Sequence, residues 1–153
     1  MKLIISLLAC FTWIQLIAGC SKNKEMRSGP NNASITDSMK LKISIGTNTF
    51  TATLHNNATV IAFKKRLPMT IDMRDLNANE KYFDLPDTLP ANGSNPGTIQ
   101  AGDLMLYGSN TLVLFYKTFS TSYNYTPLAR IEDPTGLAAA LGSGHVTVTF
   151  ALQ

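Results

Sequence analysis

Among the 153 residues of this chain, Arg74 is the best candidate for a side chain that binds a ligand. It follows the alternating segment 69–73 and has Asp72 and Asp75 close by. A guanidinium group grips a carboxylate or a carbonyl oxygen through two parallel hydrogen bonds. Arg74 is therefore a candidate ligand-facing cation. The alternative is a surface ion pair with Asp72 or Asp75.

Arg130 is a second candidate cation. It lies in the stretch Leu-Ala-Arg-Ile at residues 128–131, which has the composition of a short strand. On one face of that strand its side chain could point into a groove. The alternative is a salt bridge on the strand surface with Glu132 or another acid.

Aromatic side chains are densest between residues 107 and 125. Phe115 and one of its neighbours are expected in the core, because adjacent strand residues face opposite sides. Tyr123 and Tyr125 lie in a loop rich in Ser, Thr and Asn, where exposed aromatic rings can bind peptide or sugar. The alternative is that these rings fold back onto the body of the domain. The candidate aromatic ligand contacts are Tyr107, Tyr116, Tyr123 and Tyr125.

The sequence gives little support for a metal site, a nucleophilic enzyme or a nucleic-acid-binding surface. His55 and His145 are the only histidines, whereas a metal site usually needs three or four converging ligands, so we expect no metal and no cofactor. No nucleophile sits in a recognisable elbow, and no Gly-rich phosphate loop follows a strand. With 13 basic and 10 acidic residues, the chain is too weakly basic to favour nucleic acid as a partner. Enzymatic activity is open, and the sequence leans against it.

The N-terminus has the architecture of a secretory signal. Lys2 precedes the apolar stretch 3–17, and small residues lead into Cys20. This pattern resembles the lipobox of bacterial lipoproteins. The resemblance implies that residues 1–19 are removed and that Cys20 receives diacylglyceryl and a further acyl chain such as palmitate. The alternatives are an ordinary signal cut before Ser21 and a transmembrane anchor.

The lipoprotein interpretation sets the organisation of the mature chain. Residues 20–38 are polar and predict a flexible tether, and residues 39–153 have the length of one domain. Because Cys10 lies in the removed segment and Cys20 carries lipid, the mature protein has no thiol. No acidic cluster follows Cys20, which favours the periplasmic side of the outer membrane. We expect a monomer held on the membrane through Cys20.

Alternation of apolar and polar residues predicts a mainly β domain. Asn56 or Asn57 caps a first short helix, whose buried side would include Val60, Ile61 and Phe63. Asp133 caps a second helix at 137–141. The expected strands cover residues 40–45, 50–54, 69–73, 82–85, 104–107, 111–117, 128–132 and 146–152. About eight strands with two short helices favour a closed or nearly closed barrel.

The order of these motifs resembles a bacterial cyclophilin-like domain family. The resemblance is carried by residues 40–46, 63–67, 68–73, 101–104, 112–117 and 128–131. It implies a closed barrel capped by helices, the fold of the cyclophilin peptidyl-prolyl isomerases. Those enzymes share a catalytic arginine on a Phe-His-Arg type strand, which this sequence lacks.

The sequence thus predicts a lipid-anchored envelope protein with one cyclophilin-like barrel. We expect a non-catalytic binding or accessory module, with a peptide or small molecule near Arg74 and the aromatic loop. The alternative from another class is a divergent prolyl isomerase that assists folding in the periplasm. A third possibility is a structural lipoprotein that builds complexes.

Overall fold

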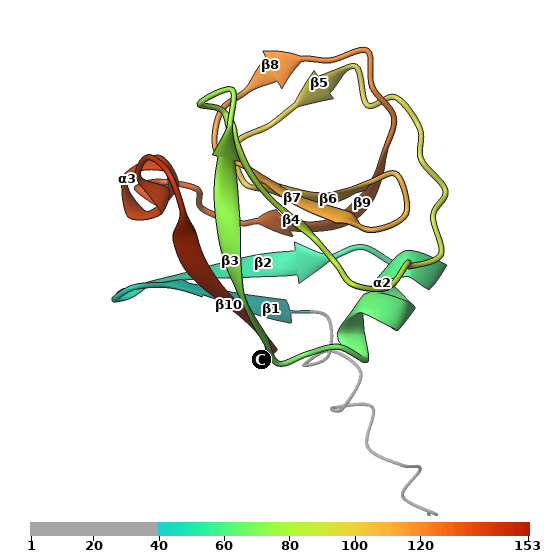
Figure 1. Cartoon of the computed structure of the whole chain (residues 1–153), viewed down its shortest axis with the longest axis horizontal. Coiled ribbons are helices and arrows are strands. Elements are labelled where there is room, and N and C mark those ends of the chain that lie inside the picture. The colour runs from blue at the N-terminus through green and yellow to red at the C-terminus, as the bar shows by residue number, and fades with distance from the viewer. Residues whose placement is uncertain (1–39) are drawn as a thin grey trace, which may run out of the picture. The chain divides into compact units, whose positions relative to one another are not determined.

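Eight antiparallel strands close into a barrel (Figure 1). The computed structural model describes residues 40–153, so the expectations for Cys20, the signal 1–19 and the tether 20–38 lie outside the described residues. All of the strand pairs that close the barrel lie within residues 40–153. In their order around the barrel the strands are β1 (Lys40–Ile45), β10 (Val146–Leu152), β3 (Met69–Leu76), β4 (Glu80–Asp84), β7 (Thr111–Phe115), β6 (Asp103–Tyr107), β9 (Tyr125–Ile131) and β2 (Asn48–Leu54).

The barrel interior is built by strand alternation. On β1, Leu41, Ile43 and Ile45 are buried whereas Lys42 is exposed. Successive strand residues point to opposite faces, so one face fills the barrel and the other meets water. Full burial of each such aliphatic side chain contributes about 1.5–3 kcal/mol. The apolar cluster inside the barrel is therefore the main source of stability.

Strand β7 departs from this pattern because both of its faces are covered. Leu112 and Leu114 point into the barrel, while Val113 and Phe115 belong to a second apolar cluster on the outer face. That cluster is closed off by a two-stranded ribbon, β5 (Thr98–Ile99) paired with β8 (Phe119–Ser120). Figure 1 shows this ribbon on the side of β6 and β7 that faces away from β1 and β2.

Helix α2 (Ala58–Lys64) packs over the barrel. Asn57 Oδ1 accepts a hydrogen bond of 2.9 Å from the Val60 backbone N–H, which satisfies one free donor at the helix start. Phe63 is fully buried and meets Phe150 edge to face, with 6.3 Å between ring centroids. The expected burial of Ile61 is wrong, since it is 59% exposed. A seven-residue helix buries one stripe, and Ile61 lies off it.

Helix α3 (Leu137–Leu141) starts later than the Asp133 cap predicts. Its N-cap residue is Gly136, whereas Asp133 Oδ1 accepts from the Thr135 N–H at 3.0 Å in a local turn. Leu137 and Leu141 are buried, as two residues one turn apart on the same helix face should be. The prediction of a mainly β fold with a closed barrel and two short helices is confirmed.

Three further strands differ from the prediction. Strand β9 begins at Tyr125, three residues before the expected strand, so Tyr125 is part of the sheet and not of a loop. The short strands β5 and β8 lie in segments expected to be loops. Both differences concern the same region, the outer face of the barrel under the β5–β8 ribbon.

Candidate functional site

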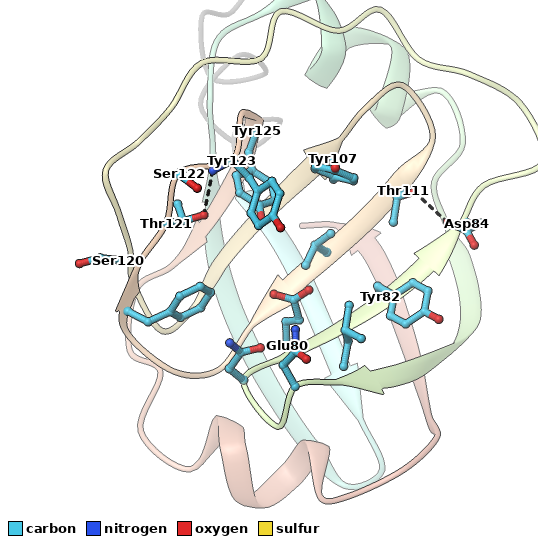
Figure 2. A pocket seen from close by; sticks show the side chains of 15 residues that line it. Glu80, Tyr82, Asp84, Tyr107, Thr111, Ser120, Thr121, Ser122, Tyr123 and Tyr125 are labelled. Atoms are coloured by element: carbon cyan, nitrogen blue, oxygen red, sulfur yellow. Dashed lines mark hydrogen bonds between the residues drawn. The ribbon is translucent and has the colours of Figure 1, made fainter.

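A pocket of about 560 Å³ lies between the outer face of the barrel and the segment 119–125. This volume falls within the usual range for small-molecule sites, about 300–1,000 Å³. Figure 2 shows its side chains arriving from β4, β6, β7 and the loop before β9. The pocket is lined by Leu76, Asn77, Asn79, Glu80, Tyr82, Asp84, Tyr107, Thr111, Val113, Phe119, Ser120, Thr121, Ser122, Tyr123 and Tyr125.

Glu80 is the buried ionisable group of this pocket. It opens β4, where strand alternation places it on the outer face together with Tyr82 and Asp84. Its partner across the ladder is Phe115 of β7, and only 9% of its surface is exposed. Burial, with a smaller effect of the Asp75 charge, raises the pKa of Glu80 to about 6.

The aromatic rings of the pocket form a continuous series. Tyr107 meets Tyr123 edge to face at 6.1 Å and Tyr125 at 5.6 Å, measured between ring centroids. Behind them Phe115 meets Tyr125 at 5.4 Å and Phe119 at 5.7 Å. Tyr107 and Tyr123 are exposed, whereas Tyr125 is buried. The series therefore runs from the protein surface to the inner wall of the pocket.

Backbone pairing positions the segment that carries Tyr123 and Tyr125. Ser94 and Tyr125 exchange two backbone hydrogen bonds of 3.0 Å, although they lie far apart in the sequence. The Thr121 N–H donates to the Gly97 carbonyl at 2.9 Å, next to the pairing of Thr98 with Ser120. The loop before β5 thus holds the aromatic segment against the barrel.

The pattern of the Cyclophilin-like family matches residues 43–151, most of the barrel just described. The chain belongs to this family. It is also similar in fold to the solution structure of the hypothetical protein AF2241 from Archaeoglobus fulgidus, with a TM-score of 0.57. That likeness covers 76% of this chain and 95% of the other at 16% identity, so it shows the fold alone. No curated protein matches the sequence.

Neither candidate arginine of this cyclophilin-like chain lines the pocket. Arg74 Nη2 lies 3.3 Å from Asp84 Oδ2, and its guanidinium covers the Tyr82 ring at 4.7 Å from the centroid. Arg130 Nη1 donates to Asp103 Oδ1 at 3.0 Å on β9. Arg74 therefore pairs with an acid other than Asp72 or Asp75, whereas Arg130 pairs with an acid on the strand surface, as the alternative from the sequence allowed.

The four candidate tyrosines separate into two groups. Tyr107, Tyr123 and Tyr125 are brought together in the pocket, as described above. Tyr116 lies elsewhere, since its hydroxyl donates to Asp75 Oδ2 at 2.8 Å. Burial and this hydrogen bond to a carboxylate raise the pKa of Tyr116 to about 12. Tyr116 therefore supports the β3–β4 end of the barrel and does not line the pocket.

Sequence reasoning did not single out Glu80, Tyr82 or Phe119. A signal was present for the first two, because Glu80, Tyr82 and Asp84 alternate at strand spacing beside the predicted strand 82–85. Phe119 belongs to the aromatic region 107–125 that the sequence pointed to, but it was not among the candidate ligand contacts, and its place in the pocket depends on the β5–β8 pairing. Within residues 40–153 no helix is long and apolar enough to span a bilayer, and no three potential ligands gather around a metal site.

Proposed function

We propose that this protein is a lipid-anchored binding module of the bacterial cell envelope, which holds a peptide segment or a small molecule in the pocket beside segment 119–125. The observation that carries this proposal is the pocket itself. It is concave, it is walled by aromatic rings, and its outer rings, Tyr107 and Tyr123, are exposed. Exposed aromatic side chains next to a preformed cavity are typical of a recognition surface.

Binding is better supported than catalysis. A prolyl isomerase of the cyclophilin type would need an arginine directed at its substrate. Arg74 and Arg130 are each paired with a carboxylate, and neither arginine lines the pocket. The residues that line the pocket include no Arg, Lys or His. The alternative, a divergent prolyl isomerase, therefore lacks a candidate catalytic arginine in the pocket. The fold alone is compatible with either role.

The anchor is proposed from the sequence. Cys20 at the end of the apolar signal would carry the acyl chains, and two or more chains give stable membrane attachment. A periplasm-facing position in the outer membrane agrees with the absence of acidic residues directly after Cys20. Metabolic labelling with an alkyne fatty acid tests this: the full-length protein should take up the label, and Cys20→Ala should abolish both the label and membrane fractionation.

Binding is tested on the unacylated chain from residue 21, which keeps the whole closed barrel. Backbone amide NMR spectra are recorded with a mixed library of peptides and cationic, neutral and anionic small molecules. We expect at least one compound to move the resonances of residues 76–84 and 119–125 together. Tyr123→Ala should weaken that response, whereas Ile61→Ala, an equally exposed side chain on α2, should not.

A protease-coupled prolyl isomerisation assay decides the alternative. The unacylated chain should not accelerate X-Pro isomerisation above the uncatalysed rate. Acceleration that is lost on Arg74→Ala or Arg130→Ala would overturn the binding module and assign an isomerase. A folded chain that responds to no compound in the NMR library would instead favour a structural, complex-building role.

A further inference from the structure

The chemistry of the pocket also indicates what kind of ligand it takes. We infer that its ligand carries a primary or secondary ammonium group on an apolar stem, held by Glu80 and surrounded by the pocket tyrosines. The source could be a free aliphatic amine or a lysine side chain of a peptide. This inference rests on the proposed binding function and adds the charge and shape of the bound group.

Glu80 is the only buried charged residue within residues 40–153 that lacks an opposite charge. The other two are Lys81 and Asp103. Lys81 Nζ lies 2.7 Å from Asp75 Oδ2, and Asp103 Oδ1 accepts from Arg130 at 3.0 Å. A buried carboxylate without a partner is costly, and proteins normally pair it. The missing partner of Glu80 is therefore expected from outside the chain.

The carboxyl group is directed at open space rather than into the core. Figure 2 shows it pointing away from its own strand toward the side on which Tyr123 and Tyr125 lie. Glu80 itself lines the pocket, so a ligand can reach it without unfolding the barrel. A charged donor bound there would replace the solvation that Glu80 loses on burial.

The aromatic walls suit a cation. Ammonium groups are attracted to the faces of aromatic rings within about 6 Å, and the attraction grows as water is excluded. Tyr107, Tyr123 and Tyr125 stand on one side of Glu80 (Figure 2). Tyr82 and Phe119 also line the pocket. The Tyr82 ring already contacts a cation of the chain, since the Arg74 guanidinium lies 4.7 Å from its centroid.

The charged residues that line the pocket are both acidic, which disfavours an anionic ligand. The fifteen lining residues include Glu80 and Asp84 but no Lys, Arg or His, although the whole chain has a formal net charge of +3. Asp84 is paired with Arg74, so the uncompensated charge of the lining is that of Glu80, which would repel a carboxylate or phosphate. The pocket is thus acidic on a chain that is otherwise slightly basic.

A second acceptor favours an ammonium that still bears hydrogens. Asn79 also lines the pocket, and its Oδ1 is buried with no hydrogen-bond partner in the described part of the chain. A primary ammonium has three donors and could serve both Glu80 and a nearby acceptor, whereas a quaternary ammonium has none. An unmet buried acceptor costs about 1–3 kcal/mol, so its satisfaction would add to binding.

The experiment uses matched probes that differ in charge. The unacylated chain from residue 21 is titrated by NMR at about pH 8 with n-butylammonium, n-butanol and butyrate, because Glu80 is then ionised and the amine is charged. We expect n-butylammonium alone to move the resonances of the pocket. Glu80→Gln should weaken its binding about tenfold or more, whereas Glu132→Gln, the same change outside the pocket, should leave it unaltered.

Peptide arms separate the two sources. A short peptide with a central lysine is compared with the same peptide bearing an acetylated lysine. Binding of the lysine peptide but not its acetylated form would assign a peptide ligand, and binding of n-butylammonium alone would assign a free amine. Equal binding of n-butanol and n-butylammonium, or unchanged binding by Glu80→Gln, would overturn the inference. If only neutral or anionic library compounds occupy the pocket, the binding function holds and the ammonium inference fails.

Discussion

Lys81 of β4 and Asp75 of β3 stand opposite each other in the sheet and form an ion pair in which the lysine is fully buried. Lys81 Nζ has no solvent exposure, lies 2.7 Å from Asp75 Oδ2 and also donates to the Gly144 carbonyl at 2.9 Å. The same carboxylate oxygen accepts from the Tyr116 hydroxyl. These contacts tie β3, β4 and the residues around β7 to the loop before β10. Because Lys81 is paired with Asp75, it does not neutralise Glu80, the residue that precedes it on β4.

Removal of Asp75 should destabilise the barrel strongly. Asp75→Ala leaves the Lys81 ammonium buried with one carbonyl partner, and such a change costs about 3–5 kcal/mol. Lys81→Met should cost less, because Asp75 is partly exposed and keeps the Tyr116 hydroxyl and the Ala78 N–H. The free energy of unfolding in urea measures both, and the double variant Lys81→Met with Asp75→Asn should recover part of the loss. A cost below about 1 kcal/mol for Asp75→Ala would contradict the pairing.

The same ion pair should make the folded protein less stable at low pH. Hydrogen bonds from Lys81 and then Tyr116 hold the pKa of Asp75 below its ordinary value of 3.8. A lowered native pKa means that the stabilisation is complete above about pH 3.8 and is lost as pH falls through the native pKa. Urea unfolding below pH 4 should therefore show a steeper loss of stability in the parent chain than in Asp75→Asn.

The fold could be predicted from the sequence because most of its strands carry a local signal. Leu41, Ile43 and Ile45 alternate with polar residues, and the turn residues between strands limit the possible pairings. Closure of the barrel followed from strand number and the need to cover sheet edges. The family resemblance added the order of the motifs, and the match over residues 43–151 confirms it.

The candidate site could be predicted only in part, for a physical reason. Its tyrosines were visible as an aromatic cluster, but the pocket depends on pairings between distant segments, such as Ser94 with Tyr125 and Thr98 with Ser120. A strand of two residues is too short to show an alternating pattern of apolar and polar residues in the sequence. The surroundings of Glu80 also depend on distant segments, because Glu80 is paired with Phe115 of β7, a member of the outer apolar cluster. Sequence reasoning therefore favoured the charged residues Arg74 and Arg130, whose partners lie across the sheet.

Glu80→Gln should stabilise the protein at neutral pH. The native pKa of about 6 lies above the ordinary 4.5, so the folded chain holds the proton more tightly between these values. Stability consequently falls as pH rises from about 4.5 to 6, and the ionised side chain costs about 1–2 kcal/mol above that range. Glutamine carries no charge and removes this cost. Urea unfolding should show a gain of that size at about pH 7.5 and little change at about pH 4.

Glu132→Gln is the control for this prediction. The pKa of Glu132 is lowered by its hydrogen bonds from Lys40 and Thr53, so its substitution should not raise stability at neutral pH. A gain in stability for Glu80→Gln together with weaker amine binding would be the mark of a residue kept for function at the expense of stability. Loss of stability at neutral pH would show that Glu80 has a favourable partner in the folded chain.

Ala78→Gly should stabilise the β3–β4 hairpin. Asn77 and Ala78 both have positive φ, 55° and 53°, in the three-residue connection between the paired residues Leu76 and Glu80. A non-glycine residue pays about 1–2 kcal/mol in this conformation, whereas glycine loses more entropy on folding, so a net gain of about 0.5–1 kcal/mol is expected. Thermal unfolding measures it. Ala139→Gly in helix α3 is the matched control. Ala139 has a helical φ, so this change should destabilise the protein by a similar amount. A loss of stability in both variants would contradict the turn argument.

Phe119→Ala should loosen the segment over the pocket while leaving the barrel intact. Phe119 is half-buried and packs on Phe115 in the outer cluster, so its removal weakens the contact between the β5–β8 ribbon and the sheet. Amide hydrogen exchange should accelerate about tenfold or more at Thr121 and Ser94, whose N–H groups bond to Gly97 and Tyr125.

The barrel amide of His55, bonded to the Leu128 carbonyl, reports on the rest of the fold and should keep its exchange rate in Phe119→Ala. Phe83→Ala is the matched control, since Phe83 is also half-buried but packs on the cluster inside the barrel. It should speed exchange at His55 and Thr121 alike, through global unfolding. Equal acceleration at both amides in Phe119→Ala would mean that ribbon and barrel unfold as one unit, and the pocket could then not open without loss of the fold.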